Sequence, residues 1–164
     1  MGSKGSALSG VQGRCPWPYL LALIAPLALA SCSSPPPPAV LTLNIVGSAG
    51  QNPDANGHGT TVAVQLYQLA ATGKFQSTDV YSLISKEQAV LGTDEMGTSE
   101  QFLVTPGQTL TETRPLKPTV TAVGLAVLFR EINQSTWKLV APVAPNGPSV
   151  VTLQINGLTA TIAK

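Results

Sequence analysis

The chain has 164 residues and a net charge of +1 at pH 7, with 43% hydrophobic and only 10% charged residues. This length suits one domain with a sizeable core, and the near-neutral charge excludes the basic surface typical of nucleic-acid binding. Thr, Val, Ala, Leu and Gly are abundant, and this composition favours strands and turns over helices.

Residues 1–31 have the features of a bacterial lipoprotein signal peptide. Two basic residues precede an apolar run at 19–30, which Pro26 interrupts. A membrane-spanning helix needs about 20 apolar residues, so this run favours a cleaved secretory signal over a permanent span. Residues 29–32 read Leu-Ala-Ser-Cys, which has the form of a lipobox. We therefore expect a lipid on Cys32, in preference to ordinary cleavage or an unprocessed anchor.

A lipid on Cys32 fixes where the mature protein is expected to reside. Two or more acyl chains anchor a protein stably, whereas one chain anchors it only marginally. Ser33 follows the cysteine, in place of the aspartate that retains many lipoproteins at the inner membrane. The expected location is therefore the outer membrane, on its periplasmic side.

The mature chain would contain a short stalk and one folded domain. Four consecutive prolines follow Ser33 and Ser34 and favour a stiff, extended segment. We assign residues 32–39 to the lipidated cysteine and this stalk, and residues 40–164 to a sandwich domain. Cys15 is lost with the signal peptide, so no disulfide is expected within the mature chain.

Alternating apolar and polar residues predict the first two strands, which begin at Val40 and Val62. Residues 47–60 between them are rich in Gly, Asn, Asp and Pro, and a loop of this length tends to be functional or disordered. The residues at 52–54 form a natural turn. From the residues alone, a plain turn and a contact with a partner protein remain equally open.

One short helix is predicted over residues 75–85. Apolar residues recur there at helical spacing, and Ser77 or Thr78 can cap the start, with Asp79 in the first turn. Residues 87–97 are expected to be a polar connection.

The second half of the chain predicts further strands. Residues 101–105 and 108–114 flank a Pro-Gly turn, and the charges of the latter favour an edge position. Residues 119–132 carry large side chains on one face and small ones on the other, as expected of a central strand covered on both sides, with another backbone close to its small face. The pair Asn156-Gly157 predicts a final hairpin. Seven or eight strands predict a mainly β fold, a two-sheet β-sandwich with one short inserted helix.

No residue pattern indicates catalysis, a metal or a cofactor. His58 is the only histidine, and a solvated loop histidine explains it better than a metal ligand does. Glu87 together with the adjacent Asp94 and Glu95 could be read as a pair of carboxyl groups for acid–base chemistry. A polar connecting segment is the simpler explanation of these residues. We therefore expect a protein that is not an enzyme.

Three aromatic residues raise the alternative of a small-ligand carrier. Tyr67, Phe129 and Trp137 could form a ligand cage, but their placement in predicted strands favours core packing. A periplasmic carrier lipoprotein with a β-sandwich fold, holding its ligand inside the sandwich or between sheet and helix, is the second hypothesis.

Several short motifs follow one another in a characteristic order. They are Asn-Pro-Asp-Ala-Asn-Gly at 52–57, Val-Ala-Val-Gln-Leu-Tyr-Gln-Leu at 62–69, Pro-Gly at 106–107, Val-Gly-Leu-Ala-Val-Leu-Phe-Arg at 123–130 and Trp-Lys at 137–138. Their order behind a lipobox resembles the type VI secretion system outer-membrane lipoprotein family, TssJ (SciN). The resemblance covers residues 41–162. Gln65 and Lys138 stand where the family usually has a basic residue and an arginine.

This resemblance implies a transthyretin-like sandwich and a structural role, the anchoring of the membrane complex of a contractile toxin-injection machine to the outer membrane. The implied partner is the periplasmic C-terminal domain of TssM (IcmF-like) and, through it, TssL. In that family the loop between the first two strands is a principal contact. Carried over to this sequence, the partner-binding loop comprises Asn52, Pro53, Asp54, Ala55, Asn56, Gly57 and His58.

Overall fold

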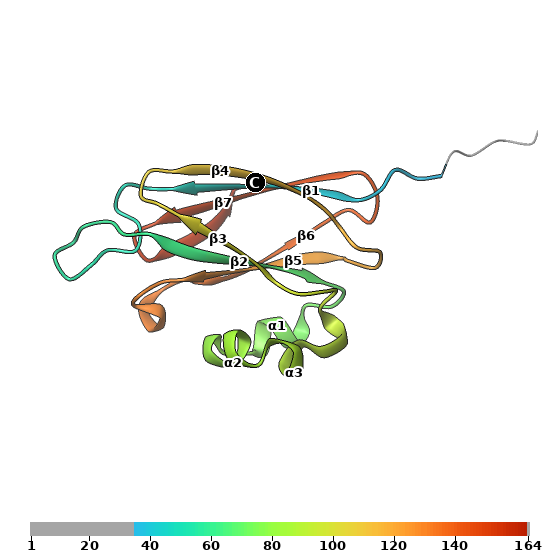
Figure 1. The fold of residues 1–164 in the computed structure, drawn as a ribbon, viewed down its shortest axis with the longest axis horizontal. Coiled ribbons are helices and arrows are strands. Elements are labelled where there is room, and N and C mark those ends of the chain that lie inside the picture. The colour runs from blue at the N-terminus through green and yellow to red at the C-terminus, as the bar shows by residue number, and fades with distance from the viewer. Residues whose placement is uncertain (1–34, 164) are drawn as a thin grey trace, which may run out of the picture. The chain divides into compact units, whose positions relative to one another are not determined.

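The computed structural model describes residues 35–163, so the expected signal peptide and the lipidation site at Cys32 lie outside the described residues. Eight strands form two four-stranded sheets that pack face to face (Figure 1). Sheet 1 has the order β4 (Thr109–Pro115), β1 (Val40–Gly47), β7 (Pro148–Asn156) and β8 (Thr159–Ala163). Sheet 2 has the order β3 (Glu100–Val104), β2 (Val62–Leu69), β5 (Ala122–Leu128) and β6 (Lys138–Pro142).

The predicted two-sheet sandwich is confirmed, and so are the positions of several strands within it. β4 lies at an edge of sheet 1, and β5 lies inside sheet 2, between β2 and β6. β7 and β8 form the predicted final hairpin, with its turn at Gly157 and Leu158, one residue later than the predicted pair Asn156-Gly157, because Asn156 still pairs with Thr159. The pairing of β1 with β7 is parallel and joins the two ends of the domain, so no local pattern could have indicated it.

The main core lies between the two sheets and is built by the alternation that the sequence shows. β1 contributes Leu41, Leu43 and Ile45, and all three are fully buried. The inward face of β5 supplies further buried apolar residues, Val123, Leu125 and Val127. Since this space is filled by side chains, the sandwich is held together by apolar burial.

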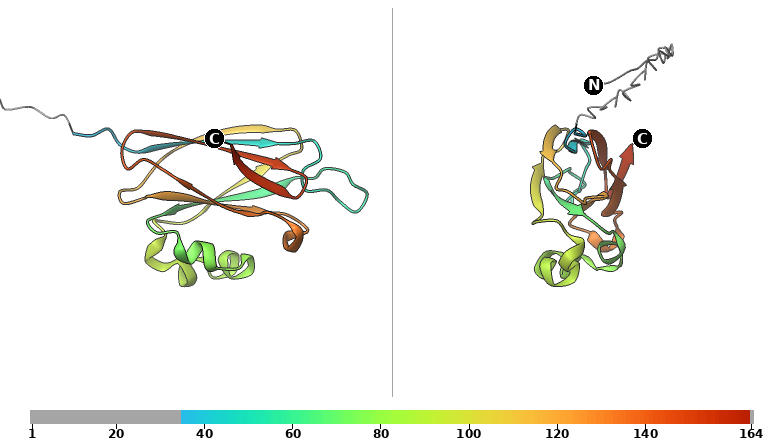
Figure 2. Two further views of the ribbon diagram at one scale, coloured as in Figure 1. Left: turned by 180° about the vertical axis from the view of Figure 1, so that it is seen from behind. Right: turned by 90° about the vertical axis from the view of Figure 1, so that its right-hand side faces the viewer.

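A layer of short helices covers the outer face of sheet 2 (Figures 1 and 2). It consists of α1 (Gly73–Ser77), α2 (Val80–Ser85) and α3 (Glu87–Leu91), followed by a 3₁₀ turn at Gly92–Asp94. The single helix expected over 75–85 is therefore wrong in number, and the expected polar connection is largely helical.

The break between α1 and α2 has a local cause. Thr78 adopts an extended conformation, with ψ at 139°, which ends α1. The Asp79 carboxylate then accepts hydrogen bonds from the amides of Tyr81 and Ser82, both at 3.0 Å, and caps the start of α2. Asp79 is thus the cap, and the expectation of Ser77 or Thr78 in that role was wrong.

A second core lies between the helical layer and sheet 2. Tyr67, Phe75, Leu83 and Leu91 are fully buried there, and the rings of Tyr67 and Phe75 have centroids 5.2 Å apart. This layer fills the space that a small-ligand carrier would need between sheet and helices. Trp137 is half-buried and packs against both cores.

The two ends of the sandwich carry different features. Residues 35–39 enter at one end, where the carbonyls of Pro37 and Ala39 accept hydrogen bonds from Gly147 N and Leu116 N, at 3.2 and 2.9 Å. The long loop between β1 and β2 projects from the opposite end (Figure 1). Within residues 35–163, no helix has the length and apolar character needed to cross a bilayer.

Candidate partner-binding loop

The loop between β1 and β2 has a buried base and an exposed tip. Gln51 and Asn52 are 0% and 2% exposed, whereas all four residues at 55–58 are exposed. This loop therefore has a fixed root, which is the arrangement expected of a recognition loop on a rigid scaffold.

Asn52 holds the root of the loop through its carboxamide. Its Nδ2 donates to Thr60 Oγ1 at 2.9 Å and to the Thr61 carbonyl at 3.0 Å. Its Oδ1 accepts a hydrogen bond from Arg130 N at 2.8 Å. The φ angle of Asn52 is +45°, a left-handed conformation that asparagine tolerates better than most residues. Asn52 therefore joins both arms of the loop to the end of β5.

Two further contacts connect the root to neighbouring turns. Gln51 Nε2 donates to the Val104 carbonyl at the end of β3, at 2.7 Å. Asn52 N donates to the Gly157 carbonyl in the β7–β8 turn, at 2.8 Å. The root is thus bound to elements of both sheets.

Asp54 organises the exposed tip. Its Oδ1 accepts hydrogen bonds from Asn56 N at 2.8 Å and from His58 N at 2.9 Å, and its own amide donates to the His58 carbonyl at 2.8 Å. The hydrogen bond from His58 N, opposed by desolvation and aided by Asn56 N, lowers the pKa of Asp54. The carboxylate therefore stays ionised at neutral pH and closes the tip.

The titratable side chains of the tip are those of Asp54 and His58. His58 Nδ1 lies 3.8 Å from Asp54 Oδ2, and its side chain is 80% exposed. Within residues 35–163, no three His, Cys, Asp or Glu side chains come together to hold a metal ion. The exposed side chains of the tip, at residues 55–58, are small or polar, and the hydrogen bonds to Asp54 fix the backbone that carries them.

The structure assigns different positions to the seven residues predicted for the loop. Asn52 is part of the buried root, Pro53 and Asp54 are partly buried, and the exposed residues are Ala55, Asn56, Gly57 and His58. Sequence reasoning missed Arg130, which is exposed and bound through its amide to Asn52. It follows the β5 pattern directly, but nothing in the sequence places it beside residue 52.

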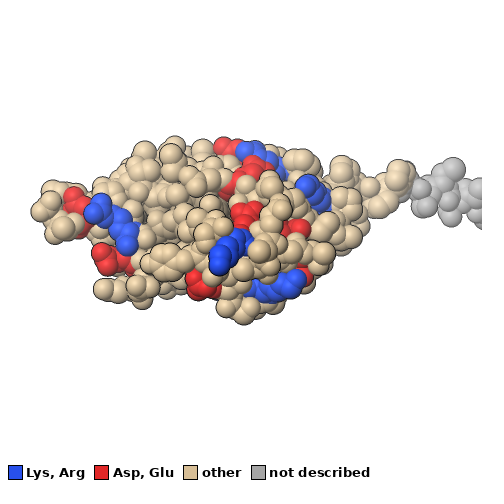
Figure 3. All heavy atoms as spheres, turned by 60° about the horizontal axis from the view of Figure 1, so that its bottom comes forward, with Lys and Arg blue, Asp and Glu red and all other residues tan. Residues whose placement is uncertain are grey.

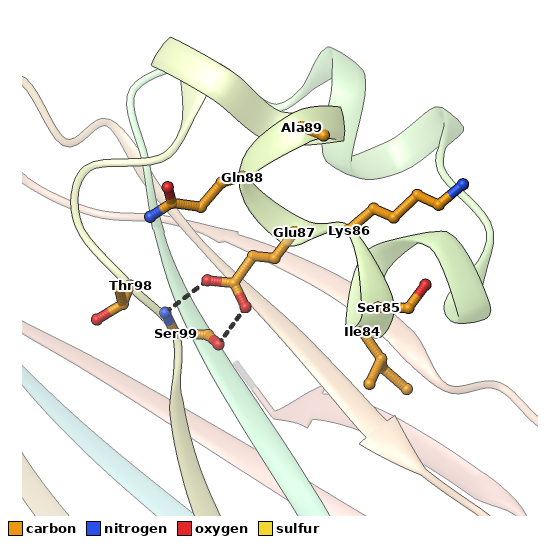
Figure 4. Close-up of a pocket in the computed structure, with 8 residues that line it drawn as sticks. All are labelled: Ile84, Ser85, Lys86, Glu87, Gln88, Ala89, Thr98 and Ser99. Atoms are coloured by element: carbon orange, nitrogen blue, oxygen red, sulfur yellow. Dashed lines mark hydrogen bonds between the residues drawn. The ribbon is translucent and has the colours of Figure 1, made fainter.

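The acidic residues considered from the sequence belong to the helical layer and its end: Glu87 begins α3, Asp94 ends the 3₁₀ turn and forms an ion pair with Lys74 at 3.1 Å, and Glu95 follows it. Figure 4 shows Glu87 beside an open hollow of about 500 Å³, where its carboxylate accepts hydrogen bonds from Ser99 N at 2.9 Å and Ser99 Oγ at 2.6 Å. Burial disfavours ionisation of Glu87, but these two hydrogen bonds outweigh it and lower the pKa of Glu87. Glu95 is buried, and burial together with the neighbouring Glu87 raises the pKa of Glu95 to about 8.

Comparison of this chain with known protein families and solved structures points to a single family. A family model described as Type VI secretion lipoprotein, VasD, EvfM, TssJ matches residues 39–158. A search of curated proteins gave no match.

The solved structures that this chain resembles come from the same secretion system. The lipoprotein TssJ1 from Pseudomonas aeruginosa is 24% identical, with a TM-score of 0.74, covering 77% of this chain and 96% of that chain. A chain in a structure described as a type VI membrane complex is 26% identical, with a TM-score of 0.67 and coverage of 76% and 98%. A chain in a structure described as the TssM C-terminal domain (869–1107) from EAEC is 25% identical, with a TM-score of 0.63 and coverage of 76% and 98%.

Proposed function

Because the chain belongs to the type VI secretion lipoprotein family, we propose that it anchors the membrane complex of that system by binding the periplasmic C-terminal domain of TssM. The match over residues 39–158 confirms the family that the sequence resembles. The family consists of structural lipoproteins of a secretion system and not of enzymes, in agreement with the sequence-based prediction.

The choice of TssM as the partner is supported by the similar solved structures. One similar chain occurs in a structure described as a type VI membrane complex, and another in a structure described as the TssM C-terminal domain. In the latter structure, 76% of this 164-residue chain covers 98% of the matched chain. The matched chain is therefore shorter than this one, and far shorter than the TssM segment 869–1107, so it is not that segment. A chain similar to ours therefore occurs in a structure named for TssM.

The observation that carries the proposed contact is the position of the loop tip. Residues 55–58 are exposed, are held in place by Asp54 and the buried Asn52, and lie at the opposite end of the sandwich from residues 35–39 (Figure 1). A domain attached to a membrane through its N-terminal side would present this tip to a partner. Association with TssL would follow indirectly, through TssM.

The proposed anchor is a lipid on Cys32 in the outer membrane, facing the periplasm. Mass spectrometry of the mature protein should show a diacylglyceryl-modified N-terminal cysteine, and fractionation should place the protein with outer-membrane lipid. Replacement Cys32→Ser should leave the protein free of lipid while the sandwich stays folded. An unmodified cysteine in the mature wild-type protein, or a wild-type protein free in the periplasm, would contradict the proposed anchor.

The loop assignment is tested by replacing only the tip. Replacing residues 55–58 with Gly-Ser-Gly-Ser should weaken binding of the purified TssM periplasmic domain by about tenfold or more in a binding titration. Replacement of the exposed Pro145 and Asn146, in a turn at the other end of the sandwich, is the matched control and should leave the affinity unchanged. Undiminished affinity of the tip variant would show that TssM does not bind this loop.

A further inference from the structure

The outer face of sheet 2 carries a row of apolar side chains, at the end that bears the loop, which the helical layer covers only in part. Ala63 on β2 pairs with Leu103 on β3 and with Leu128 on β5, so the three residues form one row across neighbouring strands. The helical layer covers the part of this face around Tyr67 and leaves Leu103 61% exposed. Sheet faces exposed to water usually carry polar residues, so an apolar row here requires an explanation.

Helix α2 extends this row into a larger apolar surface. Tyr81 and Ile84 are 68% and 45% exposed, although most large apolar side chains of the domain are buried. Together with Leu128 and Ile132 they line an open hollow of about 220 Å³ between α2 and the end of β5. We call Leu103, Ala63, Leu128, Tyr81 and Ile84 the apolar patch.

The charges around the apolar patch are arranged at its borders. Figure 3 shows a broad uncharged stretch of this side of the molecule, between the charged groups near one end and those farther along. Arg130 lines the same hollow as Tyr81 and Ile84, is exposed, and makes no ion pair with any side chain in residues 35–163. The arrangement fits a partner that presents apolar side chains next to a carboxylate.

Arg130 also connects the apolar patch to the loop. Its amide donates to Asn52 Oδ1 at the root, so the patch and the exposed tip are joined through one residue. Residues 35–39 lie at the other end of the sandwich (Figure 1), so the beginning of the domain does not cover the patch. The expected occupant is therefore a second molecule that reaches both surfaces.

We propose that the apolar patch continues the partner interface from the loop tip onto sheet 2 and α2, where it receives bulky apolar side chains of TssM, with a TssM carboxylate beside Arg130. This proposal rests on the proposed function, because it assigns a second contact to the same partner. The loop tip supplies polar recognition, and the patch supplies the apolar burial on which most of the affinity depends.

The test compares charged substitutions on the apolar patch with one on another exposed apolar residue. The double variant Leu103→Glu, Ile84→Glu in the full-length chain, purified in detergent, should bind the TssM periplasmic domain about tenfold more weakly or worse. Val150, on β7 of sheet 1, is 67% exposed and supplies the matched control. Val150→Glu should leave the affinity unchanged. Thermal unfolding of each variant checks the fold, which should survive because Leu103, Ile84 and Val150 are 61%, 45% and 67% exposed.

A charge reversal tests the second half of the proposal. Arg130→Glu should also weaken binding, and the loss should shrink at high salt, because the interaction is electrostatic. Lys86→Glu is the matched charge control, because Lys86 is the exposed C-cap residue of α2 and does not line the hollow that contains Arg130; it should have a smaller effect.

The outcomes separate this proposal from the proposed function. If the tip variant weakens TssM binding and the folded double variant does not, the patch proposal is wrong and the proposed function stands. If the wild-type chain does not bind TssM, both are wrong. If the wild type forms dimers that the double variant cannot form, while TssM affinity is unchanged, the patch binds a second copy and our proposal is overturned.

Discussion

The ring of Phe75 lies against Gly124 so closely that a Cβ at position 124 would come within 2.7 Å of Phe75 Cζ. Phe75 belongs to α1 and Gly124 to the middle of β5, so this contact fixes how near the helical layer approaches sheet 2. The sequence predicted a small outer face on this strand with another backbone close to it. The neighbour is instead an aromatic side chain that needs the same space.

We predict that Gly124→Ala destabilises the fold by about 1–3 kcal/mol, because the added methyl group must displace the Phe75 ring or shift α1. Gly50→Ala is the matched control, since no atom lies within 4 Å of a Cβ at that position. Denaturant unfolding of the two variants measures the difference. Equal stability of both would show that the helical layer is not held at this distance by Phe75.

We predict that Asn52→Ala costs about 3 kcal/mol of stability, because the Thr61 carbonyl and the Arg130 amide lose their buried partner and alanine resists a positive φ. The exposed Asn56 provides the control, and Asn56→Ala should change the free energy of unfolding by less than about 0.5 kcal/mol. A small effect of Asn52→Ala would mean that the loop root is not rigid.

We predict that Lys138→Met loosens the attachment of α1 to sheet 2. Lys138 Nζ donates to the carbonyls of Phe75, Gln76 and Thr78 at 3.2, 2.6 and 2.7 Å, and lies 4.9 Å from the centre of the Trp137 ring. Loss of these bonds should cost about 1–3 kcal/mol in denaturant unfolding. Lys138→Arg keeps a cation with several donors and should lose less than half of that amount. Equal losses would show that a positive charge at position 138 does not by itself hold α1 to sheet 2.

We predict that the stability of the domain falls as the pH rises from about 4.5 to about 8, because of Glu95. Its pKa is raised from 4.5 to about 8 in the folded protein, since burial and the nearby Glu87 carboxylate favour the neutral form. The unfolded chain binds fewer protons than the folded one between these values, so rising pH favours unfolding. The stabilisation is fully present below about pH 4.5 and is lost as the pH passes through about 8.

Two substitutions test this pH dependence. Glu95→Gln should flatten the decline in the free energy of unfolding between pH 5 and 8, because glutamine stays neutral throughout. Glu131→Gln, at an exposed position, should leave the decline unchanged. A decline that persists in Glu95→Gln would assign the pH dependence to another group.

Much of the fold was predictable because strand and turn signals are local. Residues 40–47 and 62–69 alternate with period two, and both form strands with the expected side chains buried. The pair Asn156-Gly157 predicted the β7–β8 hairpin without reference to the rest of the chain, although the turn itself lies at Gly157 and Leu158. Helix boundaries were less accurate, because one extended residue, Thr78, divides what the apolar spacing suggested was a single helix.

The candidate site was predictable only as a segment. Composition singled out residues 47–60 as a long loop, and the family resemblance assigned it to a partner. Neither could show that Asn52 is buried and Ala55 exposed, because that division depends on Thr61, Arg130 and the turn at Gly157.

The sequence by itself determined the strands, the central position of β5, the long loop and the family to which the chain belongs. Only the tertiary structure decided the parallel pairing of β1 with β7, the burial of the loop root and the alignment of Leu103, Ala63 and Leu128 into one row across sheet 2. The reason is physical. Alternation and turn chemistry act between neighbouring residues, whereas these features arise from contacts between segments that are far apart in the chain and meet only after the two sheets have packed.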